Sequence, residues 1–285
     1  MYYGLIILSV VMFGACFAFQ DVYRKRQGSG FLVSMRFSAV SSFMSLLALL
    51  IINKLSLGCT GFTLLMAFLT ALNSLAFSFC SFKALGSINL SLYSLFSMLG
   101  GMALPFLQGI LFYGEPLTGA KVICFVIICV ALLVTVEKGE KKNGTIYYVG
   151  VFVLNGMSGV LSKIFASAEL AKASATDYSI WSCIFTVVLA GLVVLFSKRK
   201  AELPKLTLPT LGISALSGIT NRVANLILVI ALTHVDASVQ YPMVTGGVMI
   251  VSTLICFFGD NKPSKKEVLS VAIAFIGMLV LFLPF

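Results

Sequence analysis

Residues 84–136 read ALGSINLSLYSLFSMLGGMALPFLQGILFYGEPLTGAKVICFVIICVALLVTV, and they decide the fold because the chain repeats their pattern. Residues 231–282 read ALTHVDASVQYPMVTGGVMIVSTLICFFGDNKPSKKEVLSVAIAFIGMLVLF. In both segments an Ala-Leu helix end precedes an apolar stretch with a double glycine, a Gly-acid turn and a second apolar stretch. The acids of the turns, Glu115 and Asp260, are predicted to cap the helices that follow. The matched positions are Ala84 and Ala231, Gly100 and Gly246, Gly101 and Gly247, and Gly114 and Gly259.

Ten apolar runs occupy most of the chain, and they predict transmembrane helices. Of the 285 residues 59% are hydrophobic and 11% charged, whereas a soluble domain carries about 25% charged residues. In a bilayer every backbone polar group must be paired within the segment, so runs of this length are helical. The fold class is therefore an all-α integral membrane protein with ten transmembrane helices. The runs lie near residues 2–20, 30–53, 61–83, 88–113, 118–136, 145–166, 177–197, 206–233, 237–258 and 267–283.

The repeat divides the chain into two halves of five helices, residues 1–143 and 144–285. Further upstream, the Tyr-Tyr pair at 2–3 matches the pair at 147–148, again at an offset of about 145 residues. An odd number of helices per half requires the second half to insert upside down relative to the first. Inverted repeats around a site at the membrane midplane are typical of secondary transporters.

These motifs resemble the EamA branch of the drug/metabolite transporter superfamily. The resemblance rests on the repeated helix, turn and helix pattern with GEPLT at 114–118, and on Arg36 near the start of the second run. The second copy departs from the family pattern, because it reads GDNKPS at 259–264 and places Trp181 where Arg36 would match. The resemblance implies a ten-helix transporter with a central cavity, in a family whose substrates include amino acids, nucleotide-like metabolites and drugs.

Basic residues predict the orientation, because they concentrate in connectors on the cytoplasmic side. Three basic residues, Lys54, Lys121 and Lys172, follow even-numbered runs. This asymmetry predicts a multi-pass protein of the cell (plasma) membrane with both termini outside. The fourteen basic residues that follow odd-numbered runs are Arg24, Lys25, Arg26, Lys83, Lys138, Lys141, Lys142, Lys198, Arg199, Lys200, Lys205, Lys262, Lys265 and Lys266.

The sequence argues against other classes of protein. A net charge of +10 would suggest nucleic-acid binding in a soluble protein, but here the charge serves orientation, so no nucleic acid is expected. One histidine, no CxxC motif, no Walker A sequence and no dinucleotide fingerprint predict that the chain is not an enzyme and holds no metal or cofactor. The expected partners are the lipid bilayer and a small-molecule substrate. A monomer or a homodimer is expected, because one chain already contains both halves.

Three basic residues, Arg36, Lys163 and Arg222, remain inside the apolar runs. A charge at bilayer depth is costly unless it meets a partner, water or the interface, so each is a candidate for function. Arg36 and Lys163 are close enough to the ends of their runs to reach the interface instead. Arg222 lies midway along its run, and we expect it to face protein or a water-filled cavity.

Uncharged polar residues complete the predicted substrate site. Asn221 and Asn225 are four positions apart and share a helix face beside Arg222. The alternative for each polar residue is a hydrogen bond that only joins two helices. The further candidates are Asn73 in the third run, Asn155 in the sixth, Tyr93 in the fourth, and Gln240 and Tyr241 in the ninth.

The charge pattern predicts the class of cargo. No acidic residue lies deep in a run, whereas basic residues do, which favours an anionic or zwitterionic metabolite such as an amino acid. We therefore expect a secondary active transporter that works by alternating access. The alternatives are a passive channel or lipid scramblase, and a drug exporter. Counterflow separates a carrier from a channel, because a channel shows neither saturation nor trans-stimulation.

Overall fold

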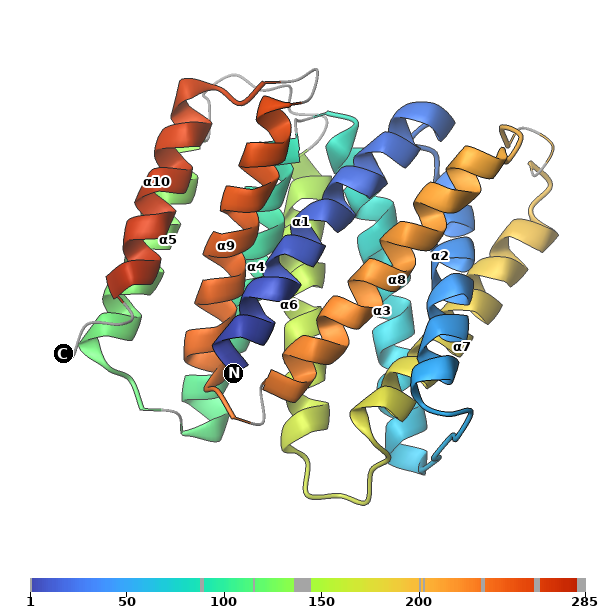
Figure 1. The fold of residues 1–285 in the computed structure, drawn as a ribbon, viewed down its shortest axis with the longest axis horizontal. Helices are drawn as coiled ribbons and strands as arrows, with labels where there is room; N and C mark the ends of the chain where they lie inside the picture. The colour runs from blue at the N-terminus through green and yellow to red at the C-terminus, as the bar shows by residue number, and fades with distance from the viewer. Residues whose placement is uncertain are drawn as a thin grey trace.

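The structure, a computed structural model, describes residues 2–87, 90–114, 116–135, 145–199, 201, 203–231, 234–258 and 262–280. Within these ranges the chain forms ten α-helices and no strand (Figure 1). Glu115 and Asp260, the predicted helix caps, lie outside the described residues. The helices are α1 (Tyr2–Gln27), α2 (Phe31–Ile52), α3 (Gly61–Leu85), α4 (Leu90–Tyr113), α5 (Gly119–Thr135), α6 (Thr145–Ser167), α7 (Ala175–Phe196), α8 (Leu208–Ala231), α9 (Ala237–Phe257) and α10 (Lys265–Val280).

The length and apolar character of the helices confirm an all-α protein of the multi-pass membrane type. Eight helices of the described chain are long and apolar enough to cross a membrane, for which about 20 residues are needed. The other two, α5 and α10, have 17 and 16 residues.

Helix α1 is longer than its apolar run predicts, because it continues through charged residues to Gln27. Arg24 Nη2 donates to Asp21 Oδ1 at 2.8 Å, and Lys25 Nζ lies 3.2 Å from Asp21 Oδ2. Ion pairs between residues three and four positions apart stabilise a helix. Positive charge in the last turn also interacts favourably with the negative end of the helix dipole. The apolar run therefore predicts the membrane span but not the end of the helix.

Helix α7 begins with a capping box. The Asp177 backbone N–H donates to Ser174 Oγ at 3.1 Å, and the Ser174 backbone N–H donates to Asp177 Oδ2 at 3.1 Å. Asn53 Nδ2, at the end of α2, also donates to Asp177 Oδ1 at 2.8 Å. The Asp177 carboxylate therefore fixes the start of α7 and joins it to α2.

Replacing Ser174 with Ala is expected to lower the free energy of unfolding by about 1 kcal/mol, because the first turn of α7 loses a side-chain acceptor. The unfolding midpoint of the purified protein in detergent measures this change. A midpoint equal to that of the parent protein would contradict the cap.

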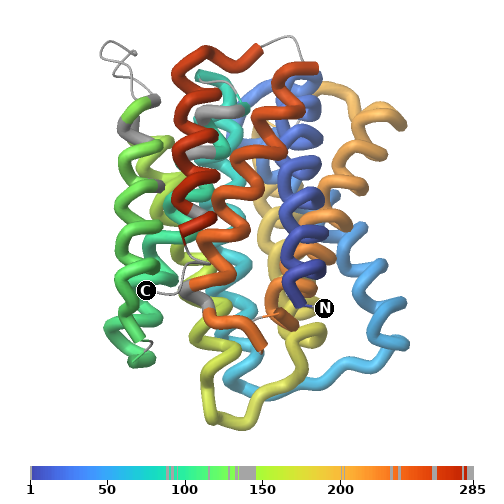
Figure 2. The backbone as a smooth tube through the Cα atoms, turned by 60° about the vertical axis from the view of Figure 1, so that its left-hand side comes forward, coloured from blue at the N-terminus to red at the C-terminus, as the bar shows by residue number. Residues whose placement is uncertain are grey.

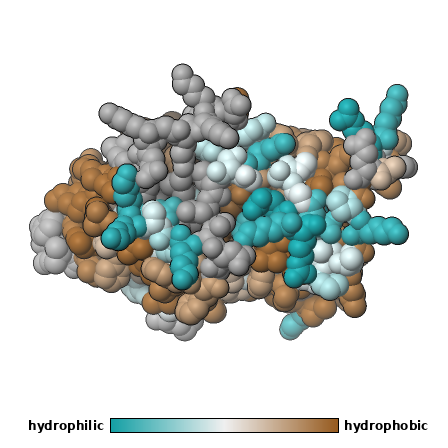
Figure 3. All heavy atoms as spheres, turned by 90° about the horizontal axis from the view of Figure 1, so that it is seen from above, coloured by the Kyte–Doolittle hydropathy of each residue, from teal (hydrophilic) through white to brown (hydrophobic). Residues whose placement is uncertain are grey.

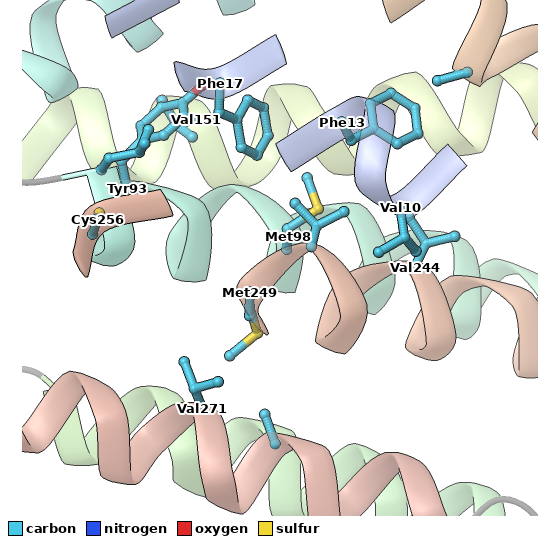
Figure 4. Packing of buried hydrophobic residues seen from close by; sticks show 14 of the residues in the cluster. Val10, Phe13, Phe17, Tyr93, Met98, Val151, Val244, Met249, Cys256 and Val271 are labelled. Atoms are coloured by element: carbon cyan, nitrogen blue, oxygen red, sulfur yellow. The ribbon is translucent and has the colours of Figure 1, made fainter. Parts of the chain in front are cut away.

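The helices of the two halves interleave rather than forming separate domains. Helix α1 packs chiefly on α8 and α9, and α4 packs on α6 and α9. Helix α3 packs on α6 and α7, and α2 packs on α7 and α8. Helices α5 and α10 pair at one edge of the bundle (Figures 1 and 2). The largest hydrophobic cluster joins α1, α4, α9 and α10 through Val10, Met98, Met249 and Val271 (Figure 4).

Successive helices run in opposite directions, so all odd-numbered helices end at the same end of the bundle (Figure 1). We call this the basic end, because Arg24–Arg26, Lys83, Lys198–Arg199 and Lys262 lie there in the described chain. Figure 3 looks onto this end and shows hydrophilic side chains gathered between hydrophobic flanks. Tyr2, the first described residue, lies at the opposite end.

Candidate functional site

A cavity lined by both polar and apolar side chains lies at the centre of the bundle. Its volume is about 240 Å³, and its lining comes from the eight helices α1–α4 and α6–α9. Ligand pockets for drug-sized molecules measure about 300–1,000 Å³, so this cavity fits a smaller metabolite. Helices α5 and α10 contribute no lining residue among those described.

Hydroxyl groups dominate the polar part of the lining, which includes ten serines and three threonines. Several of them donate to the carbonyl one turn earlier in their own helix, as Ser45 does to Ser41 O at 2.7 Å and Ser162 to Ser158 O at 2.9 Å. A serine satisfied in this way is tolerated inside a helix. Its oxygen lone pairs remain available to water or to a ligand.

Sequence reasoning missed the serines of α2, although a signal for them exists. Ser38, Ser41, Ser42 and Ser45 all line the cavity. They occupy positions i, i+3, i+4 and i+7, which form one face of a helix. A serine stripe at helical spacing in an otherwise apolar run therefore indicates a polar cavity.

Arg222 supplies the charge of the cavity. It is the only charged residue in the described lining, which holds no Asp or Glu. Its Nη1 donates to Ser182 Oγ of α7 over a long 3.5 Å. A guanidinium with five N–H donors and no carboxylate in the lining is suited to bind an anion.

The asparagines next to Arg222 also line the cavity, as do Asn73 and Asn155. Asn225 Nδ2 donates to Asn221 O at 2.8 Å and to Asn221 Oδ1 at 3.1 Å. The amide of Asn225 therefore holds the orientation of Asn221 on the same face of α8.

Asn73 and Asn155 connect helices as well as lining the cavity. Asn73 Nδ2 of α3 donates to Leu154 O of α6 at 2.9 Å, and Asn155 Nδ2 of α6 donates to Ser97 O of α4 at 2.6 Å. These bonds use the amide nitrogens, so the side-chain oxygens are left as acceptors. The two alternatives from the sequence, a lining role and a helix-joining role, coexist at both residues.

The remaining sequence candidates divide into two groups. Gln240 and Tyr241 line the cavity, and Gln240 Oε1 is buried with no hydrogen-bond partner in the described chain. Tyr93 and Lys163 are absent from the lining. Tyr93 is fully buried and its hydroxyl lies 2.8 Å from Ser81 Oγ, while Lys163 Nζ lies 5.2 Å from the centre of the Tyr113 ring. The structure thus brings seven of the nine candidates to the cavity.

Arg36 also lies outside the lining, near the basic end. Its Nη1 donates to Pro204 O at 2.6 Å, and its Nη2 donates to Gln27 Oε1 at 2.5 Å. Pro204 belongs to the connector between α7 and α8, so Arg36 joins the first half of the chain to the second.

Comparison with known proteins supports the fold. No protein-family model and no curated protein matches the sequence. Among the solved structures, the crystal structure of a protein with 17% sequence identity aligns with 96% of this chain and 97% of its own, at a TM-score of 0.64. At this identity the likeness shows the fold alone. The chain therefore shares its overall fold with a solved protein over nearly its whole length.

Proposed function

We propose that this protein is a secondary active transporter of the EamA type, in the drug/metabolite transporter superfamily. It carries a small organic anion or zwitterion, such as an amino acid, across the cell membrane by alternating access. The observation that carries the proposal is the central cavity, in which a hydroxyl-rich lining surrounds Arg222 as its one charge.

The packing of the helices supports ten spans in two inverted halves. Exchanging α1–α5 with α6–α10 converts the α1–α8 contact into α6–α3 and the α1–α9 contact into α6–α4, and all four contacts exist. The same exchange converts α2–α8 into α7–α3, and it leaves α2–α7, α4–α9 and α5–α10 unchanged. A two-fold relation of this kind is the basis of alternating access in secondary transporters.

Close approaches at glycines support the same relation. A Cβ added to Gly101 of α4 would meet the Asn155 side chain of α6, and one added to Gly247 of α9 would meet the Val10 side chain of α1. Likewise Gly159 of α6 faces Pro105 of α4, and Gly14 of α1 faces Val251 of α9. The α4–α6 crossing and the α1–α9 crossing therefore each have a close-approach glycine on both of their helices.

The chemistry of the lining supports an anionic group on the cargo. Arg222 offers charged donors to a carboxylate or phosphate. An ammonium or hydroxyl elsewhere on the cargo has acceptors in the amide oxygens of Asn73 and Asn155. The described lining has no carboxylate to attract a lipophilic cation, and this argues against the drug exporter.

Reconstituted protein tests the proposal. A thermal-shift screen of small carboxylates, phosphates and amino acids on the purified protein first identifies ligands, and counterflow in proteoliposomes then measures their exchange. We expect saturable uptake of labelled ligand that is stimulated by unlabelled ligand inside. Linear flux without trans-stimulation would indicate a channel, lipid movement without solute flux a scramblase, and a preference for lipophilic cations a drug exporter; each result would overturn the proposal.

We further propose that the basic end faces the cytoplasm. A reporter that is active only in the cytoplasm, fused after Phe285, is expected to be inactive. The same reporter inserted in the connector between α7 and α8 is expected to be active. The reverse result would overturn the orientation and leave the transport proposal intact.

A further inference from the structure

The eight helices that line the cavity form a closed ring. In order around the cavity they are α1, α8, α2, α7, α3, α6, α4 and α9; each packs on the next, and α9 packs on α1 (Figures 1 and 2). The ring divides into two arcs of four helices. We call α8, α2, α7 and α3 the arginine arc, because it includes Arg222, and α6, α4, α9 and α1 the second arc. A ligand that fills the cavity contacts both arcs.

Hydroxyl groups accompany Arg222 on its arc. Arg222 Nη1 donates to Ser182 Oγ of α7. One turn earlier on α7, the Tyr178 hydroxyl lies 2.6 Å from Thr70 Oγ1 of α3. Helix α2 adds its serine stripe, which includes Ser45. An acidic group bound to Arg222 therefore has neutral polar side chains from α2, α3 and α7 on the same arc.

Three helices of the second arc present an apolar wall to the cavity. Four side chains form this wall, all of them in the largest hydrophobic cluster and at most 8% exposed. Figure 4 shows them where α1, α4 and α9 meet. They are Phe13 and Phe17 of α1, Met98 of α4 and Val244 of α9. Phe77 and Leu228 of the arginine arc belong to the same packing and extend the apolar surface.

Polar side chains beside the apolar wall already use their protons within the protein. Cys16 Sγ of α1, and Gln240 Nε2 and Thr245 Oγ1 of α9, each donate to a backbone carbonyl at 3.0 to 3.1 Å. Among the described lining residues of α1, α4 and α9 none is charged. A charged group of a ligand would lose its hydration at this wall without gaining a charged partner, which is costly, whereas an apolar group would not.

We propose that the cargo is an amphipathic anion, in which one acidic group such as a carboxylate is joined to an apolar tail. The acidic group binds Arg222, and the tail lies against Phe13, Met98 and Val244. This inference rests on the proposed function and narrows its substrate class. A sugar phosphate or a dicarboxylic acid does not fit, because its second polar group would face the apolar wall.

Straight-chain carboxylates from acetate to hexanoate test the tail. Calorimetric titration of the purified protein measures their dissociation constants. Affinity is expected to rise about three- to four-fold for each methylene added, as burial of a methylene group requires. Glycine and norleucine make the same comparison for zwitterions, and norleucine is expected to bind more tightly. Hexylamine has the same tail with the opposite charge, and it is expected to bind at least about ten-fold more weakly than hexanoate.

Val244→Thr and Val248→Thr form a matched pair. The two valines lie one turn apart on α9 and belong to the same cluster, but in the described chain only Val244 lines the cavity. Threonine has nearly the shape of valine, and its hydroxyl can donate to the carbonyl one turn earlier. Val244→Thr is expected to weaken hexanoate binding about five-fold and acetate binding less than about two-fold. Val248→Thr is expected to change neither, and unfolding midpoints verify that both variants fold.

Arg222→Met separates this inference from the proposed function. It is expected to weaken acetate and hexanoate binding by the same factor, so that the gain per methylene remains. Equal affinities along the series, or equal losses of hexanoate affinity in Val244→Thr and Val248→Thr, would overturn the amphipathic cargo and leave an anion carrier intact. The same holds if no acid of the series binds while the broader thermal-shift screen finds a ligand. Tighter binding of hexylamine than of hexanoate would overturn both proposals.

Discussion

Arg222→Met is expected to weaken binding of an anionic cargo about 10- to 100-fold. A hydrogen bond to a charged group contributes about 1.5–3 kcal/mol, and each 1.4 kcal/mol corresponds to a factor of ten in affinity. Methionine keeps an apolar, unbranched side chain of similar reach, so the change removes the guanidinium with little effect on packing. The half-saturation concentration in counterflow measures the loss. The half-saturation concentration of Arg222→Lys is expected to lie between those of the parent protein and Arg222→Met, because lysine keeps the charge but not the planar set of donors.

Lys163→Gln is the matched control for Arg222→Met. Both residues are charges inside apolar helices, and the sequence marks both as candidates. Lys163 lies against the Tyr113 ring outside the cavity, so neutralising it is expected to change the half-saturation concentration less than two-fold. If Lys163→Gln weakened binding as much as Arg222→Met, the charge of the whole bundle rather than the cavity would govern binding.

Gly100→Ala is expected to cost about 3 kcal/mol or more of folding free energy. A Cβ at this position would overlap the backbone of Phe152, and backbone atoms cannot move aside as a flexible side chain can. Helices α4 and α6 must then separate, which disturbs their packing along the crossing. The unfolding midpoint in detergent, together with the yield of monodisperse protein, reports the damage.

Gly212→Ala on α8 provides the comparison, since nothing lies within 4 Å of a Cβ built there. Alanine is the better helix former by about 1 kcal/mol, so this variant is expected to match or exceed the stability of the parent. The same substitution thus has opposite signs at the two glycines. Equal effects at both positions would show that helix propensity, and not the close approach of α4 and α6, determines the outcome.

The sequence predicted most of the fold because a membrane span has a strong signal. Within the described residues each of the ten apolar runs forms a helix. The largest error concerns the end of α1, where a local ion-pair network extends the helix. The register between α1 and α6 agrees with the contacts. The Tyr-Tyr match pairs position 14 with position 159, and Gly14 lies against Val251 while Gly159 lies against Pro105. The double-glycine match pairs positions 105 and 251 in the same way.

The cavity was less predictable than the fold. The sequence positions of Arg222, Asn73 and Asn155 give their depth along their helices, and this depth is enough to identify them as candidates for the cavity lining. The direction in which Lys163 or Tyr93 points depends on the rotation of a helix about its axis, and this rotation is set by packing against other helices. Tyr93 and Gln240 occupy matched positions in the two halves, yet only Gln240 lines the cavity.

The serine stripe of α2 has a consequence for selectivity. Ser38, Ser41 and Ser45 already donate their protons to protein acceptors, so displacing water from these three hydroxyls leaves their donors satisfied. Cargo molecules with different side chains therefore meet a similar dehydration cost on this side. At the guanidinium of Arg222 the dehydration cost differs between ligands. A ligand without a negative group displaces the water around the guanidinium and leaves its charge unpaired. Such a site discriminates sharply by charge and weakly by shape, which suits a carrier that handles a group of related compounds.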